Sequence, residues 1–191
     1  MRELYNYRIN EAYVFKPTSK EELKKIIDQR IKEQGPNCDL NDIDVSKITD
    51  MSDLFLGTKF NGDVSKWKVG NVKDMSGMFS FSPFNGNLSK WDVSKVEDMA
   101  NMFRESKFNG DISRWNVSRV KDMFGLFYAT PFNGDISKWN VGRVKNMEFM
   151  FYNSSFDGDI SGWDVYNVRD MQSMFRRSPL EGKEPVWYEE K

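Results

Sequence analysis

The sequence predicts an α/β repeat solenoid, in which about six 24-residue coils stack in a right-handed sense behind an N-terminal helical cap. Two columns of residues recur at this interval without a change of register. The tryptophan column is Trp67, Trp91, Trp115, Trp139 and Trp163, and the methionine column is Met51, Met75, Met99, Met123, Met147 and Met171. One amphipathic segment precedes the repeats. Because a single coil cannot bury its own apolar residues, stacking is the arrangement that removes them from water.

Residues 1–35 form the predicted N-terminal capping segment, with an amphipathic helix over 19–34. Ser19 stands three residues before Glu22, which is the spacing of a capping box. Apolar side chains then follow at helical spacing, and Gly35 ends the helix. We expect this helix to cover the open apolar end of the first coil. The alternative is a helix that binds a partner.

The coils are predicted at 36–59, 60–83, 84–107, 108–131, 132–155 and 156–179, so that the solenoid spans 36–179 and residues 180–191 form a degenerate C-terminal cap. Within a coil the apolar spacing changes from the two-residue step of a strand to the three- and four-residue steps of a helical turn. Each coil is therefore expected to hold one short strand, a bend and one short helical turn. The tryptophans are expected in the core, against the alternative of an exposed platform for sugars or bases.

Two polar columns are expected to shape the turns. Asn-Gly pairs at 61–62, 85–86, 109–110 and 133–134 predict corners in which glycine takes a positive φ. A second column lies immediately before the methionines and consists of Asp50, Asp74, Asp98, Asp122, Asn146 and Asp170. Short acceptors at such a position predict caps for the segment that follows.

The composition argues against an enzyme. The chain has no histidine, which removes the commonest general base and metal ligand, and its one cysteine, Cys38, has no histidine to activate it. The Asp63, Asp111 and Asp135 column lacks the spacing of a calcium loop and is better explained by its turns. No catalytic residue, metal ligand or cofactor is therefore expected.

The net charge and the hydropathy of the chain limit the cellular locations and the classes of partner that are expected. With 28 basic and 29 acidic residues, the formal net charge is -1, so no global attraction to nucleic acid or to an anionic membrane is expected. The first fifteen residues hold no apolar run long enough for a signal-peptide core, and no stretch is long enough to span a membrane. These features predict a cytoplasmic protein, or a cell-surface or secreted one if a leader has been removed. They leave the oligomeric state open.

A basic row is the first surface feature that the repeat itself does not require. It consists of Lys66, Lys90, Arg114 and Lys138, each placed one residue before a tryptophan and so expected to face away from the core. Stacked cations repel one another unless something neutralises them. The row is interpreted as a solvated face of mixed charge, with an acidic protein patch or a nucleic-acid backbone as the alternative ligand, and Lys90, Arg114 and Lys138 are candidate binding residues.

A set of aromatic residues is the second such feature. Phe124 stands in the column that holds Ser76, Ala100 and Glu148 in other coils, and Phe149 stands where other coils have Gly77 or Gly125. Tyr128 and Tyr152 lie in the variable segment after the core phenylalanine. Because stacking sets the core columns, extra aromatic residues outside them indicate a contact beyond the coil, and clustered exposed rings are typical of protein interfaces. The four are predicted to form a binding patch on the helical side of coils four to six. Packing against the N-terminal or C-terminal segment is the alternative.

The motif Ile-x-x-Trp-x-Val-x-x-Val-x-x-Met-x-x-Met-Phe, followed by Phe-Asn-Gly-Asp, resembles the BspA-like family of bacterial surface proteins, an offshoot of the leucine-rich repeats. The resemblance covers about residues 36–179. It implies a leucine-rich-repeat-like stack whose repeats bind host proteins or neighbouring cells and carry no catalytic activity.

These observations together predict a non-enzymatic protein-binding module. The expected role is an intracellular adaptor or inhibitor that docks on another protein, including a host or defence complex. A cell-surface adhesin is the first alternative. The second is a binder of nucleic acid, which would act only through the basic row or through a ribonucleoprotein partner.

Overall fold

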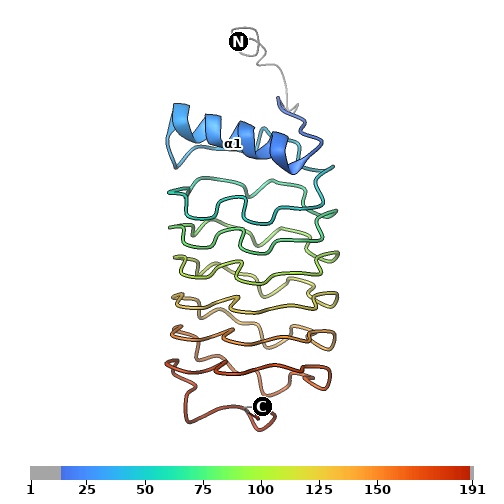
Figure 1. The fold of residues 1–191 in the computed structure, drawn as a ribbon, viewed down its shortest axis with the longest axis vertical. Helices are drawn as coiled ribbons and strands as arrows, with labels where there is room; N and C mark the ends of the chain where they lie inside the picture. Colours follow the sequence, from blue (N-terminus) through green and yellow to red (C-terminus); the bar gives the residue numbers. More distant parts are fainter. Residues whose placement is uncertain (1–13, 190–191) are drawn as a thin grey trace.

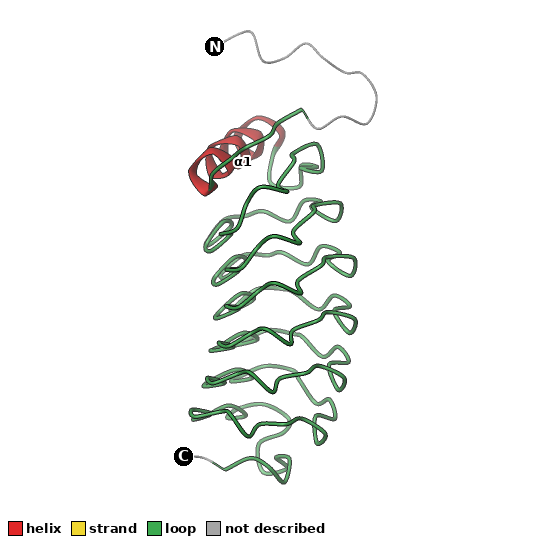
Figure 2. Cartoon of the chain, turned by 90° about the vertical axis from the view of Figure 1, so that its right-hand side faces the viewer, coloured by secondary structure: helices red, strands yellow, loops and turns green. Residues whose placement is uncertain are grey.

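The computed structural model describes residues 14–189 as successive coils stacked along the long axis, with one helix across the N-terminal end (Figures 1 and 2). Residues 1–13 of the predicted N-terminal segment and 190–191 of the predicted C-terminal cap lie outside the described residues. Over 14–189, helix α1 (Lys20–Gln34) is the only helix, and β pairing is confined to isolated one-residue bridges.

Helix α1 begins and ends at local signals in the sequence. The Ser19 hydroxyl accepts a hydrogen bond from the Glu22 amide at 3.2 Å, and the Glu22 carboxylate accepts one from the Thr18 amide at 2.8 Å. The hydrogen bonds that the Glu22 carboxylate accepts from the amide and the hydroxyl of Thr18 lower the pKa of Glu22. At the other end Gly35, with φ of 87°, donates its amide to the Ile31 carbonyl at 2.9 Å. The helix therefore occupies the range expected from its capping residues.

Apolar burial and two ion pairs fix α1 on the first coil. Leu23 and Ile27 are fully buried in the core that continues through the stack. Lys20 Nζ lies 3.2 Å from the Asp50 carboxylate, and Arg30 pairs with Asp42. The helix thus covers the N-terminal end of the apolar core.

Parallel backbone contacts join each coil to the next at an offset of 24 residues. The capping column forms the bridges Asp50 to Asp74, Asp74 to Asp98, Asp98 to Asp122, Asp122 to Asn146 and Asn146 to Asp170. Each side chain in this column also accepts an amide hydrogen bond from two residues further on, as Asp98 does from Ala100 at 2.8 Å. The predicted caps therefore close a turn at the start of the segment that follows.

That segment differs from the predicted helical turn. In coil two the amides of Met75, Gly77 and Phe79 donate to carbonyls of the next coil at 2.8–3.0 Å, whereas Met78 and Ser80 donate to the residue three positions before. Because every second amide bonds outside its own coil, no continuous helical ladder can form. The result is a run of tight turns, with positive φ at alternate corners.

The core consists of columns of identical or similar side chains. Trp67 and Trp91 stack with ring centroids 6.3 Å apart and planes 7° from parallel. Each indole N–H donates to a carbonyl 27 residues earlier, and that of Trp115 reaches the Leu88 carbonyl at 3.1 Å. Trp115 is only 4% exposed, so burial confirms the prediction that the tryptophan column is core. The hydrogen bond satisfies the one polar group that each indole carries into the core.

The Asn-Gly glycines serve a purpose different from the one predicted. Positive φ occurs at Gly77 and Gly125, but not at Gly62 or its equivalents in later coils. A Cβ at Gly62 would lie 2.0 Å from the Cys38 carbonyl oxygen and 2.7 Å from the Phe60 ring. The prediction of left-handed corners at these pairs was therefore wrong, and glycine is needed because backbone and ring approach closely.

The asparagines of these pairs link successive coils. The side-chain oxygen of Asn61 accepts the amide of Asn85 at 2.9 Å, and the same contact recurs along the stack. Each asparagine therefore fixes the corner of the following coil rather than only its own.

The C-terminal segment closes the far end of the core. Trp187 stacks on Trp163 at 6.3 Å and donates to the Ile160 carbonyl at 3.0 Å, while Tyr188 packs edge-on against Phe175 at 5.0 Å. Trp187 thus continues the tryptophan column for one more level. Over residues 14–189, none of the helical structure is long and apolar enough to cross a bilayer.

Candidate functional site

The four aromatic residues singled out by the sequence lie against one another. Phe149 packs edge-on against Phe124 at 5.9 Å, against Tyr128 at 6.4 Å and against Tyr152 at 5.7 Å. Tyr128 and Tyr152 stack face to face at 4.9 Å. All four are partly exposed. We call these four residues the aromatic cluster.

The tandem turns position the cluster on one side of the stack. We call the outward surface of segments 51–57, 75–81, 99–105, 123–129, 147–153 and 171–177 the turn wall. Phe127 and Phe151 point into the core and are fully buried, whereas the next residues, Tyr128 and Tyr152, remain partly exposed. Because equivalent residues repeat at each level, aromatic side chains in one outward column meet across neighbouring coils.

Phe149 has an unusual backbone for an aromatic residue. Its φ is 55°, in the left-handed region, where the equivalent residues of other coils include Gly77 and Gly125. A side chain with a Cβ at such an angle costs roughly 1–2 kcal/mol relative to the right-handed region. Asp53, Asn101 and Ser173 take a left-handed φ at the equivalent position, so the turn imposes this backbone on each coil whatever residue stands there.

Two arginines extend the cluster at its ends. The Arg104 guanidinium lies 4.2 Å from the centre of the Tyr128 ring and 5.6 Å from that of Phe81, and Arg177 lies 5.7 Å from Tyr152. The sequence prediction missed both arginines. Arg104 could have been found by reading columns, because it stands 24 residues before Tyr128 in the column that also holds Tyr152.

Acidic groups also border the cluster. The Asp122 carboxylate accepts the Phe124 amide at 2.8 Å. Desolvation, and then the charge of Asp170, raise the pKa of Glu148. The surroundings of the rings are thus of mixed charge, with the arginines at the ends and carboxylates between them.

The basic row lies on a different surface. We call the outward surface of segments 64–70, 88–94, 112–118, 136–142 and 160–166 the tryptophan wall. Lys90, Arg114 and Lys138 are exposed on it, while the tryptophan that follows each is buried. Phe127 points inward from the turn wall and Trp139 points inward from the tryptophan wall, and their ring centroids lie 6.2 Å apart inside the core. The row and the aromatic cluster therefore face away from each other, and the structure does not bring these two sets of predicted site residues together.

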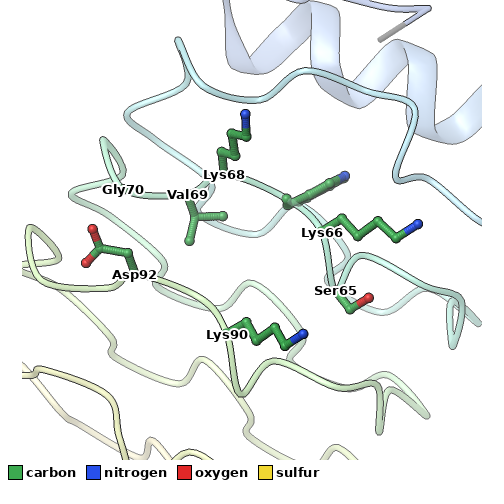
Figure 3. A pocket seen from close by; sticks show the side chains of 8 residues that line it. Ser65, Lys66, Lys68, Val69, Gly70, Lys90 and Asp92 are labelled. Atoms are coloured by element: carbon green, nitrogen blue, oxygen red, sulfur yellow. The ribbon is translucent and has the colours of Figure 1, made fainter. Parts of the chain in front are cut away.

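A shallow hollow of about 460 Å³ lies on the tryptophan wall between Lys66 and Lys90, with Lys68 and Asp92 at its edge (Figure 3). Hydrogen bonds from Ser94, and next the charge of Lys95, lower the pKa of Asp92. The cation that acts on Asp92 is therefore Lys95, which lies outside the basic row.

The other candidate sites of the sequence have structural roles here. Each aspartate after an Asn-Gly or Asp-Gly pair accepts the amide of the serine two residues on, as Asp135 does from Ser137 at 2.9 Å. Across residues 14–189, no three His, Cys, Asp or Glu side chains gather in a way that could hold a metal ion. Cys38 is buried, and this burial raises the pKa of its thiol.

A family model described as "Mycoplasma protein of unknown function, DUF285" matches residues 22–131 and again residues 80–181. The two matches overlap, as expected when one model is laid twice along a repeated unit. No curated protein and no solved structure matches the chain.

Proposed function

The chain belongs to the DUF285 family of Mycoplasma proteins of unknown function, and on that premise we propose that it is a non-enzymatic protein-binding repeat module. The observation that carries the proposal is the aromatic cluster, four partly exposed rings in mutual contact on the turn wall. Phenylalanine and tyrosine supply large contact areas with few rotatable bonds. A rigid group of this kind is suited to anchoring a partner protein.

The finer relationships are part of the same proposal. We infer that the stack is a right-handed, leucine-rich-repeat-like solenoid and that the chain is related to the BspA-like proteins. The parallel bridges at an offset of 24 residues support this inference, as does the motif repeated from the second coil to the sixth. The assignment as an intracellular adaptor or inhibitor is likewise proposed, and it predicts a stable complex of fixed stoichiometry.

The place of the cluster in the stack favours recognition over a purely structural role. The two rings of the C-terminal segment, Trp187 and Tyr188, contact Trp163 and Phe175 at the end of the core. The cluster lies along the turn wall rather than at that end, which supports its use as an interface.

The test is affinity capture of the tagged full chain from lysate of its native cell, with and without nuclease. Three proteins are compared: the wild type, the Phe124→Ser/Phe149→Ser double variant, and a control with Lys90, Arg114 and Lys138 changed to Ser on the opposite wall. Circular dichroism melting establishes that each variant is folded. We expect one stoichiometric protein with the wild type and the control, and its loss with the double variant.

Two outcomes contradict the proposal. Equal recovery of the partner by the double variant would remove the cluster from the interface. A set of proteins that disappears on nuclease treatment, and is lost in the triple control, would favour the nucleic-acid alternative. That alternative is supported by the exposed lysines at the hollow in Figure 3, and it predicts binding that weakens steeply with salt.

A further inference from the structure

Arg104 is held by rings rather than by hydrogen bonds. Its guanidinium lies between Tyr128, at 4.2 Å, and Phe81, at 5.6 Å. Its Nε is buried without a hydrogen-bond partner and forms an ion pair with the Glu105 carboxylate at the longer distance of 3.7 Å. A guanidinium oriented in this way keeps hydrogen-bond donors for a ligand at little cost in conformational entropy.

A hollow of about 330 Å³ lies on the other side of Arg104 from the aromatic cluster. Its lining is mixed, with Leu56 and Phe81 as its large apolar side chains and Asp53, Asn101 and Arg104 among its polar ones. Leu56 is 45% exposed and Phe81 is 49% exposed, so both present apolar surface to solvent. Phe81 has a φ of 54° and is thus a second aromatic ring kept at a left-handed position. The Asn101 side-chain oxygen is buried there without a hydrogen bond.

We propose that Arg104 receives the carboxylate of an acidic peptide segment whose apolar side chains fill the hollow on one side and contact the aromatic cluster on the other. This inference rests on the proposed function and specifies the chemistry of the partner. Guanidinium and carboxylate form paired, charge-assisted hydrogen bonds, and a neighbouring ring on each side excludes competing water.

The spacing of the coils fits an extended segment. Phe81 belongs to coil two and Tyr128 to coil four, so two coil spacings of roughly 4.8 Å separate their levels. An extended chain advances about 3.3 Å per residue, so roughly three residues cover this distance. The segment predicted to bind therefore has an apolar residue, an Asp or Glu one or two positions on, and a second apolar residue after that.

The charges around the site favour a peptide over a nucleic acid. Asp53 is among the residues that line the hollow, and Glu105 forms an ion pair with Arg104. A phosphate polymer would place a charge at every nucleotide and would meet these carboxylates. A single peptide carboxylate needs only Arg104.

The experiment uses a displayed library of random peptides of about twelve residues, selected on the full-length wild-type chain. A selected peptide is then synthesised, labelled and measured by fluorescence anisotropy against Arg104→Gln, which keeps most of the side-chain stem. Arg143→Gln, at an exposed arginine outside both the aromatic cluster and the basic row, is the matched control. We expect an acidic residue between apolar ones, binding weakened roughly tenfold or more by Arg104→Gln, and a change of less than about twofold with the control.

The outcomes separate this inference from the function on which it rests. One outcome would overturn only the role of Arg104. In that outcome the selected peptides lack an acidic residue, bind the wild type and Arg104→Gln equally well, and do not bind Phe124→Ser/Phe149→Ser. Peptides that bind the double variant as well as the wild type would overturn the proposed function too. Binding of a labelled oligothymidine that is lost in Arg104→Gln would replace the peptide by nucleic acid as the occupant. Melting curves confirm that every variant remains folded.

Discussion

The two walls of the stack differ in how far their residues vary from one coil to the next. On the tryptophan wall an indole recurs in each coil from the second to the sixth and donates its N–H to a carbonyl 27 residues earlier. On the turn wall, the outward column that holds Tyr128 and Tyr152 holds Leu56, Ser80 and Arg104 in earlier coils. Constant columns hold the coils together, and changing columns are free to carry a binding site. The experiments that follow test this division.

The largest expected effect comes from breaking a constant column. Trp115→Ala removes a buried ring and its hydrogen bond to the Leu88 carbonyl, and we expect a loss of about 3–5 kcal/mol in the free energy of unfolding, measured by denaturant titration. Arg114→Ala, one residue earlier and exposed, is the control and should change it by less than about 0.5 kcal/mol. Similar losses for the two variants would contradict the view that constant columns hold the coils together and exposed positions do not.

The corners between the walls should be nearly as sensitive. At Gly62 an added Cβ would lie 2.0 Å from the Cys38 carbonyl oxygen, whereas at Gly162 it would meet nothing within 4 Å. We expect Gly62→Ala to cost about 1–3 kcal/mol or more and Gly162→Ala to stabilise by about 0.4–1 kcal/mol, both read from denaturant midpoints. If Gly62→Ala left the free energy of unfolding unchanged, neighbouring coils could not approach as closely at this position as the structure shows.

A smaller effect is expected from the backbone of Phe149. Phe149→Ala and Phe149→Gly remove the same ring contacts, but only glycine adopts a φ of 55° without strain. The glycine variant should therefore be more stable than the alanine variant by about 1 kcal/mol, measured by thermal unfolding. Equal stability would mean that the left-handed backbone at this site costs nothing.

The smallest effect concerns the capping column. Burial, together with the charges of Asp74 and Asp122, raises the pKa of Asp98 against the opposing hydrogen bond from Ala100. The folded chain then binds this proton more tightly than the unfolded chain does. Ionised Asp98 therefore lowers stability at neutral pH, and that loss is recovered as the pH falls through the raised pKa toward the ordinary value of about 4.

Asp98→Asn should accordingly raise the melting temperature at pH 7 by roughly a degree or two. Asparagine can still accept the amide of residue 100, as Asn146 does from Glu148 at 3.0 Å in the same column. The difference from wild type should disappear near pH 3.5, below the ordinary pKa of about 4. A difference that grows on acidification would show that the carboxylates are not coupled as described.

Local and periodic signals explain what the sequence could predict. Ser19 and Glu22 specify the start of α1 through contacts three residues apart, and the tryptophan period alone places Trp115 in the core. The conformation after the capping column could not be read in the same way. Buried residues such as Met75, Met78 and Phe79 have the same spacing in a helical turn as in tandem turns. Hydrogen bonds to the next coil, invisible in the spacing, decide between the two.

The candidate site was predictable only in part, for a related reason. The four rings of the cluster stand out because they lie outside the constant apolar columns of the core, so their positions could be read from the repeat. Arg104 is one charged residue among many, and only the rings on both sides of its guanidinium distinguish it. The separation of the basic row from the cluster also depends on which wall each segment forms.

The most direct test of the central claim compares rings that leave the same turns in opposite directions. Phe124→Ser/Phe149→Ser changes two outward rings, and Phe127→Ser/Phe151→Ser changes two fully buried ones in the same coils. Denaturant unfolding should show that the outward pair unfolds cooperatively within about 2 kcal/mol of wild type. The inward pair should lose about 6 kcal/mol or more, enough to prevent stable folding. If the outward pair lost as much as the inward pair, the aromatic cluster would be core, and the account of the turn wall as a binding surface would be wrong.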